Sequence, residues 1–193
     1  MKRWFYLIVA LQILFLLAEA AVNQIALSRG PVITLKCVPV DPRSLFLGNY
    51  MDLSYDISSI DLSKIEHDAP AEAFRHNRTV YVGLLPQKPW AVARKLTISP
   101  PPPDKEIVYL RGRVTYRSFG HEPGERVPLE IGVYYDLERY FIPEKKQKEV
   151  EQLQFGQLRR GGRPHEITVE VAIGWKGQGL IRRVLVDGKP LKF

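Results

Sequence analysis

The turn Pro39-Val40-Asp41-Pro42-Arg43 carries the side chains of this sequence that are best suited to chemistry. Arg43 can grip a carboxylate or a phosphate through two parallel hydrogen bonds. Asp41 can cap the turn by accepting hydrogen bonds from backbone N–H groups, because the following proline fixes the backbone there. Ser44 comes next, and it would act as a nucleophile only beside a general base. We therefore take Asp41 and Arg43 as candidate binding residues.

An octet of residues, Gly48-Asn49-Tyr50-Met51-Asp52-Leu53-Ser54-Tyr55, follows this turn and opens a predicted strand. Its period-two pattern places Leu53 and Tyr55 on one face and Tyr50 on the other. We expect one tyrosine to be in the core and one to be available at the surface. Gly48, just before the strand, permits a positive φ or the close approach of another chain segment.

The octet resembles the signature of the GDYXXLXY proteins, a family of small membrane-anchored bacterial proteins. Nearly the whole chain is similar in layout, from a basic N-terminus and one apolar helix to a closing Leu185-Val186-Asp187-Gly188-Lys189. Asn49 stands where the family has Asp, and an amide can cap a turn but cannot ionise. We therefore interpret Gly48, Leu53 and Tyr55 as structural, and Asn49 and Tyr50 as candidate binding residues. The resemblance names no chemistry.

Two further landmarks shared with the family supply the remaining binding candidates. Leu110-Arg111-Gly112-Arg113-Val114 contributes Arg111, and Glu138-Arg139-Tyr140-Phe141-Ile142-Pro143-Glu144 contributes Glu138 and Tyr140. We expect Glu138 to pair with an arginine such as Arg43 or Arg111. Aromatic residues dominate burial, and some can also line a cleft for an extended peptide or glycan. The aromatic cluster comprises Tyr50, Tyr109, Tyr134, Tyr135, Tyr140 and Phe141.

No metal ion or cofactor is predicted. The four histidines, His67, His76, His121 and His165, are dispersed, and no spacing puts two of them on one helical face. Cys37 is the only cysteine, so no intramolecular disulfide can form. Its strand-like surroundings indicate a packed thiol rather than a nucleophile.

Positive charge is concentrated at the C-terminal end of the chain. The formal net charge is +7, and residues 157–193 hold 8 basic and 3 acidic residues. Such an excess is usually a solvated strand face, but it can also meet anionic lipid, an anionic envelope polymer or an acidic partner protein. No nucleic-acid-binding module accompanies the charge, so nucleic acid is not an expected partner.

The N-terminal segment predicts a membrane anchor or a signal peptide. Lys2 and Arg3 precede an apolar run from Trp4 to Ala18, so the N-terminus should stay cytoplasmic and the remainder should cross the membrane. Ala18-Glu19-Ala20 has the form of a cleavage site, which would release the domain after Ala20. The residues leave both outcomes open, and the family resemblance implies a retained single-pass anchor.

Short strands account for most of the remaining chain. We expect strands at Val32–Val38, Thr79–Leu85, Trp90–Ser99, Glu106–Tyr116, Leu129–Tyr135, Glu166–Trp175 and Leu180–Val186, in addition to the octet. Ser58–Arg78 shows weak helical spacing, and Val150–Leu158 is a candidate short helix. About seven or eight strands predict a mostly β protein. Residues 1–29 would form the N-terminal helix, and residues 30–193 a single antiparallel barrel or sandwich-like domain with minor helix.

These observations favour a non-enzymatic, membrane-anchored module outside the cytoplasm that binds an envelope protein or polymer, or serves as an accessory to a membrane protein. The alternative is a cell-envelope hydrolase built on the Asp41-Pro42-Arg43-Ser44 turn. A strand after such a turn is loosely similar to the barrels of membrane-anchored signal peptidases. Those enzymes place Ser-Met-x-Pro before the strand and a lysine base after it, whereas Ser44 is followed by Leu45.

Overall fold

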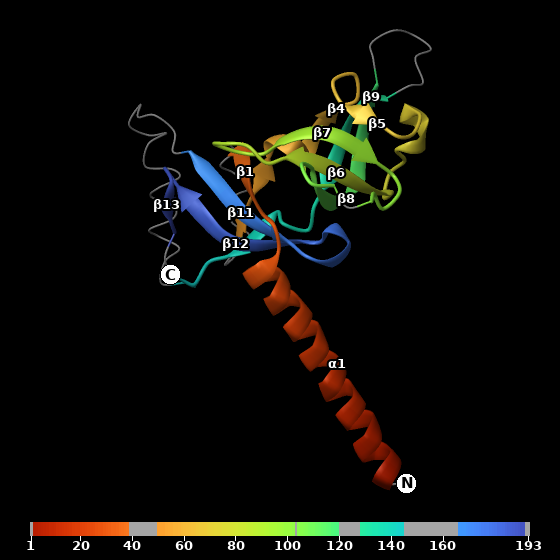
Figure 1. The fold of residues 1–193 in the computed structure, drawn as a ribbon, viewed down its shortest axis with the longest axis vertical. Coiled ribbons are helices and arrows are strands. Elements are labelled where there is room, and N and C mark those ends of the chain that lie inside the picture. Colours follow the sequence, from red (N-terminus) through yellow and green to blue (C-terminus); the bar gives the residue numbers. More distant parts are fainter. Residues whose placement is uncertain (1, 39–49, 103, 120–127, 145–165, 192–193) are drawn as a thin grey trace.

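The computed structural model describes residues 2–38, 50–102, 104–119, 128–144 and 166–191, and Figure 1 shows one long helix extending from a β domain. The domain contains mostly antiparallel sheets that curl into a half-barrel, and the described residues between the strands form only short helical turns. The predicted class, a mostly β protein with one N-terminal apolar helix and minor further helix, is confirmed.

Helix α1 (Lys2–Arg29) is apolar all round, and its described side chains are exposed along most of its length. It is long and apolar enough to cross a membrane by length and composition, a test that a signal sequence near the N-terminus would also satisfy. Because no polar face turns toward water, the helix requires an apolar environment.

The end of α1 joins the domain through close backbone contacts. Gly30 N donates a hydrogen bond to Ala26 O at 2.9 Å, and Ile173 N donates to Pro31 O at 2.9 Å. A Cβ on Gly30 would lie 2.5 Å from both Ala26 O and Ile173 O, and a Cβ on Gly174 would lie 3.1 Å from the Cβ of Ala26. At Gly30 a larger residue would force the backbone to shift, whereas at Gly174 the added Cβ would be a tight contact with Ala26. The last turn of the helix is therefore packed directly against the domain.

The smaller sheet has five strands in the order β13-β12-β11-β1-β3, all antiparallel. Residues alternate between buried and less buried along β1, where Ile33 and Leu35 face the core, as expected for a sheet with one face covered. Its strands are β1 (Val32–Val38), β3 (Ser54–Tyr55), β11 (Ile167–Ile173), β12 (Gly179–Val186) and β13 (Lys189–Pro190).

The larger sheet has six strands in the order β4-β9-β8-β6-β7-β5, antiparallel except for the β5–β7 pair. These strands are β4 (Ser59–Asp61), β5 (Glu66–His67), β6 (Thr79–Leu85), β7 (Val92–Thr97), β8 (Val108–Phe119) and β9 (Pro128–Tyr134). A separate two-stranded ribbon joins β2 (Tyr50–Asp52) to β10 (Arg139–Phe141). Three 3-10 turns complete the described elements: η1 (Asp56–Ser58), η2 (Ala71–Ala73) and η3 (Trp175–Gly177).

One hydrophobic core unites both sheets and the ribbon. Burying such side chains is the main favourable contribution to folding, roughly 1.5–3 kcal/mol for each large apolar side chain. The largest fully buried side chains are Ile33, Leu35, Met51, Tyr55, Phe74, Val80, Val82, Leu84, Leu96, Leu110, Ile131 and Ile142.

The strand predictions from longer apolar patterns agree closely with the structure. Val32–Val38 and Thr79–Leu85 are strands with those same limits, and the predicted hairpin from Thr79 to Ser99 forms as β6 and β7. The estimate of seven or eight strands is too low, because the described residues hold thirteen. Several of these are only two or three residues long, too short to show a period.

The segment Ser58–Arg78 differs from its weak helical pattern. It contains β4, β5 and η2 rather than a helix, and it buries Leu62, Ala69 and Phe74 in the core. The apolar residues of this segment are too weakly spaced to stabilise a helix, so their burial against the larger sheet determines the structure. The predicted helix at Val150–Leu158 lies outside the described residues.

Replacing Gly30 with alanine should loosen the junction between α1 and the domain. The new Cβ would meet two backbone carbonyl oxygens at 2.5 Å, so the chain must shift. We expect a loss of about 1–3 kcal/mol, equivalent to a fall in Tm of roughly 2–12 °C for a protein of this size. Thermal unfolding of the full chain in detergent micelles measures it. Gln24→Ala, at an exposed position of the same helix, is the control, and equal Tm values for the two variants would contradict the prediction.

Candidate functional site

The six described residues of the octet, 50–55, alternate between core and surface as predicted. Tyr50 is 46% exposed, whereas Leu53 and Tyr55 are buried at 4% and 1% exposure. Met51 is buried beside them, and Asp52 is half-buried. Gly48, Asn49, Asp41 and Arg43 lie outside the described residues, so their assigned roles stay predictions.

The hydroxyl groups of two buried tyrosines donate hydrogen bonds that connect the octet and the following η1 turn to the segment before β10. Tyr55 Oη donates to Leu137 O at 2.7 Å, and Tyr135 Oη donates to Ile57 O at 2.6 Å. Each hydroxyl thus satisfies a main-chain carbonyl of the other segment in a region from which water is excluded. Buried groups bonded in this way are costly to leave unpaired. In this arrangement the Tyr55 hydroxyl links the octet to the loop before β10.

The main chain adds a second set of connections between the same two segments. Leu53 N donates to Glu138 O at 2.7 Å, and β2 pairs with β10 so that Tyr140 lies opposite Met51. The register also brings Tyr50 opposite Phe141, with ring centroids 5.7 Å apart in an edge-to-face arrangement. Tyr140 is half-buried, while Tyr50 and Phe141 are exposed.

The Glu138 carboxylate caps its own loop. Oε1 accepts a hydrogen bond from Tyr135 N at 2.6 Å, and Oε2 accepts from Leu137 N at 2.8 Å. Asp136, between these two donors, has a left-handed φ of 62° that allows the chain to curl around the carboxylate. Burial raises the pKa of Glu138, and the backbone hydrogen bonds partly oppose this shift. The described contacts of these oxygens are with backbone N–H groups, and Arg43, one of the two arginines expected to pair with Glu138, lies outside the described residues.

Cys37 lies opposite Tyr55 in the β1–β3 pair and is half-buried. Burial, together with the nearby Asp56 carboxylate, raises the pKa of its thiol to about 12. At neutral pH the group is therefore a thiol rather than the reactive thiolate. This fits the predicted packing role.

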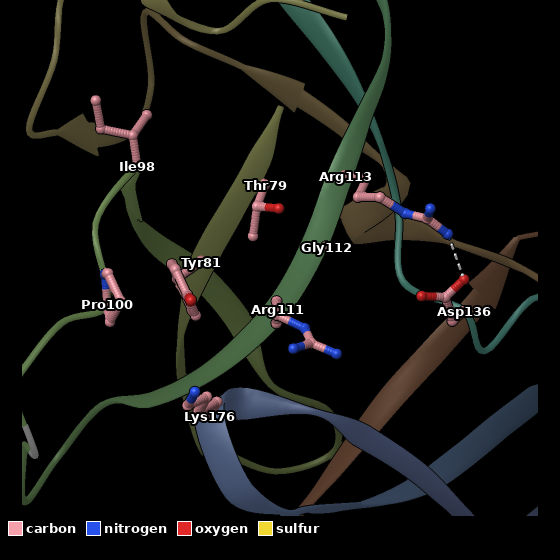
Figure 2. A pocket seen from close by; sticks show the side chains of 9 residues that line it. All are labelled: Thr79, Tyr81, Ile98, Pro100, Arg111, Gly112, Arg113, Asp136 and Lys176. Carbon is pink, nitrogen blue, oxygen red and sulfur yellow. Dashed lines mark hydrogen bonds and ion pairs between the residues drawn. The ribbon is translucent and has the colours of Figure 1, made fainter. Parts of the chain in front are cut away.

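A cavity of about 550 Å³ opens between the larger sheet and the η3 turn. Figure 2 shows its polar side chains, with Arg111 and Arg113 on β8 and Lys176 on the facing turn. The lining residues are Thr79, Tyr81, Ile98, Pro100, Arg111, Gly112, Arg113, Asp136 and Lys176.

Strand register explains why these residues share one cavity. Arg111 and Arg113 are two residues apart on β8, so they project from the same face of the sheet. Their partners across the β6–β8 ladder are Tyr81 and Thr79, which lie on that face too. The four side chains form one patch on the sheet.

The η3 turn adds Lys176 to this patch. Lys176 and Gly177 both have left-handed backbone, with φ values of 54° and 76°. A Cβ on Gly177 would lie 3.0 Å from Tyr109 O and 3.3 Å from Arg111 N, so the turn rests against the backbone of β8. Close packing at this glycine brings Lys176 near Arg111.

The cavity has an excess of positive charge. Arg113 Nη2 is 2.7 Å from Asp136 Oδ1 in an ion pair, and Lys176 Nζ lies 4.2 Å from the centre of the Trp175 ring. Asp136 is the one carboxylate among the described lining residues, so Arg111 and Lys176 are left uncompensated there. Two cations beside the hydroxyls of Thr79 and Tyr81 suit a phosphate or a carboxylate.

The residues predicted from the sequence to bind a ligand overlap only in part with the lining of this cavity. Arg111 was predicted as a binding residue, but Thr79, Tyr81, Arg113, Asp136 and Lys176 were not. The pattern Arg-x-Arg at 111–113 was a usable signal, because alternate residues of a strand share a face. Of the other predicted binding residues, Tyr50, Glu138 and Tyr140 belong to the octet network and do not line the cavity. Within the described ranges, no group of three or more His, Cys, Asp or Glu could hold a metal ion.

The fold and the site together define a class: a curled β domain carried on one apolar N-terminal helix, with a basic cavity near the junction. The family model of the GDYXXLXY proteins matches residues 12–184, so the chain belongs to the GDYXXLXY family. The match confirms the resemblance based on the octet. No curated protein and no solved structure matches the chain.

Tyr55→Phe should destabilise the domain by about 1–3 kcal/mol, because it leaves the buried carbonyl of Leu137 without its donor. Tyr50→Phe removes a hydroxyl from the same octet at an exposed position and should change stability by less than about 0.5 kcal/mol. Urea unfolding of both variants, followed by circular dichroism in detergent, makes the comparison. Equal losses for the two variants would argue against the hydroxyl pair.

Glu138→Gln should flatten part of the dependence of stability on pH. The folded pKa of Glu138 is raised above its usual 4.5, so the folded state binds this proton more tightly than the unfolded state. The contribution of Glu138 to the free energy of unfolding is therefore greatest below the usual pKa, and it declines as the pH rises through the raised pKa. The pKa of Asp56 is raised in the same direction by burial and should leave some slope in the variant.

Unfolding free energies of wild type and Glu138→Gln, measured from acid to neutral pH, test this expectation. The difference between the two curves should change across the titration of Glu138 and be level above it. Glu72→Gln, at an exposed position, serves as the control. A wild-type curve parallel to that of Glu138→Gln throughout would exclude a raised pKa at Glu138.

Proposed function

We propose that this protein is a membrane-anchored, non-enzymatic binding module that holds an anionic group of an envelope ligand in the cavity between β6, β8 and η3. The observation that carries the proposal is the excess charge of that cavity, where Arg111 and Lys176 lack a carboxylate partner among the described lining residues. Charge-assisted hydrogen bonds from such groups favour phosphate or carboxylate.

The proposed location follows from the N-terminus. Lys2 and Arg3 precede the apolar helix, which favours a cytoplasmic N-terminus and a domain on the other side of the membrane. The close packing of Ala26 against the domain supports retention of the helix as an anchor. The envelope ligand would then reach the cavity from the extracytoplasmic side.

The candidate groups of the octet network are already engaged in folding. Glu138 is bonded to two backbone N–H groups, and Tyr55 is bonded to a backbone carbonyl. Because Glu138 and Tyr55 are engaged in hydrogen bonds that stabilise the fold, a binding module is favoured over an enzyme that would use these two residues in catalysis. The alternative hydrolase rests on Asp41, Arg43 and Ser44, which lie outside the described residues, and no structural observation favours it.

Arg111→Gln should weaken anion binding by roughly tenfold or more, since a hydrogen bond to a charged group contributes about 1.5–3 kcal/mol. The measurement is calorimetric titration of the full chain in detergent with inorganic phosphate and, separately, with citrate. Arg94→Gln makes the same change of charge at an exposed position of β7 that does not line the cavity, and it should bind as wild type does. Absence of saturable binding by wild type, or equal weakening in both variants, would refute the proposal.

A further inference from the structure

Trp175 is an unusually exposed aromatic residue on a constrained turn. Its side chain is 73% exposed, whereas most large apolar side chains of the β domain are buried. The turn that carries it is held by Gly177 against β8, and Gly174 N donates to Gln178 O at 2.8 Å across its base. An indole presented to solvent in this way has an apolar body and one polar N–H, a combination suited to the border between lipid and water.

The η3 turn lies beside the end of α1. Gly174, which immediately precedes Trp175, is so close to the helix that a Cβ there would be 3.1 Å from the Cβ of Ala26. Figure 1 shows the hairpin of β11 and β12 next to the C-terminal end of the helix. Ala26 thus gives the position of the turn along the helix axis.

Helix geometry then gives the depth of the turn in a bilayer. The hydrocarbon core is about 30 Å thick and takes about 20 helical residues. Counted from Trp4, the first residue after Lys2 and Arg3, that span ends near Asn23. Ala26 stands about 4.5 Å further along the axis. The polar headgroup layer is roughly 5–8 Å deep on each side, so Gly174 and Trp175 fall within it.

The basic cavity is at the same level, because it shares the η3 turn. Lys176 follows Trp175 directly and lines the cavity, and Gly177 is in contact with the backbone of Arg111. Arg29 adds another cation at the end of α1. Lipid phosphates would therefore be the anions that are present beside this cavity at the highest local concentration.

We propose that the anionic group bound in the cavity is the phosphate of a membrane lipid headgroup, with Trp175 resting in the headgroup layer and Arg111 and Lys176 holding the phosphate. This inference rests on the proposed function and names the source of its ligand. The domain would be seated on the bilayer, with the cavity open toward the lipids around α1. The anchor would fix the height of the cavity as well as its location.

The first test measures the depth of the turn. Gln178→Cys places a thiol on the exposed turn without removing Trp175, and Lys189→Cys places one at an exposed position of β13, in the hairpin beyond β12. Native Cys37 should react little, because its pKa is about 12. Each full-length variant is labelled with an environment-sensitive fluorophore and reconstituted into vesicles that contain lipid with a nitroxide on its headgroup.

We expect the label at position 178 to be quenched at least about twofold more than the label at position 189. Equal quenching at the two positions would overturn the proposed seating of the turn. Mass spectrometry of the same preparations reads the N-terminus, and loss of residues 1–20 would also overturn it, because the anchor would be absent.

The second test measures lipid capture. Full-length protein is reconstituted in 3:1 phosphatidylcholine:phosphatidylglycerol, extracted in mild detergent, and the retained phosphatidylglycerol is counted by native mass spectrometry. The double variant Arg111→Gln/Lys176→Gln should lose at least about tenfold of the retained lipid, in line with the cost of removing charged donors. Arg94→Gln/Arg182→Gln removes the same charge outside the cavity and should retain lipid as wild type does.

The outcomes separate this inference from the proposed function. If wild type binds inorganic phosphate at Arg111 but captures no phosphatidylglycerol, the lipid assignment fails and the anion site stands. If it binds neither phosphate nor lipid, both fail. Equal lipid capture by the two double variants would mean that lipid is retained by the general positive charge of the surface. That result would overturn the assignment of the lipid phosphate to this cavity.

Discussion

The structure depends on one reciprocal pair of hydrogen bonds, from Tyr55 Oη to Leu137 O and from Tyr135 Oη to Ile57 O. These bonds fix the octet and the η1 turn that follows it against the loop that leads into β10, and both bonds are buried. The loop they hold includes Asp136, whose carboxylate pairs with Arg113 at the edge of the basic cavity. The family signature therefore acts on the candidate site indirectly. It positions the one carboxylate among the described lining residues and leaves Arg111 and Lys176 uncompensated.

The same network clarifies the chemistry of the motif. A carboxyl group is used within it, but that group belongs to Glu138, which accepts hydrogen bonds from two backbone N–H groups of its own loop. The structural role of Tyr55, at the end of the octet, depends on its hydroxyl group as a hydrogen-bond donor. The role of Leu53 depends on the burial of its apolar side chain. None of these requirements is catalytic. A domain can keep the signature as a folding element while the residues proposed to bind the anion lie on β8 and η3.

Sequence patterns predicted the features that depend on local periodicity. The alternation of the octet and the limits of β1 and β6 are readable because a period of two over several residues reports which face is buried. The cavity was not readable, because it depends on which strands pair. Arg113 meets Thr79, and Gly177 meets Arg111, only through the β6–β8 ladder and the fold of the η3 turn. The register between strands that are distant in the sequence cannot be deduced from one sequence. For this reason Lys176 was not distinguished from the other basic residues near the C-terminus.

The contact between Ala26 and Gly174 lies on the domain side of the predicted cleavage point after Ala20. A protein cut there would keep the last helical turns, and Val22 and Ile25, which are 49% and 58% exposed, would remain on its surface. Released into water, the domain would carry a short helical segment with exposed apolar side chains, and such an exposed apolar patch promotes self-association. Kept whole, the same residues continue the apolar surface of the helix into the bilayer border. Because the junction lies after the predicted cleavage point, cleavage of the N-terminus would change the solubility of the domain as well as its attachment to the membrane.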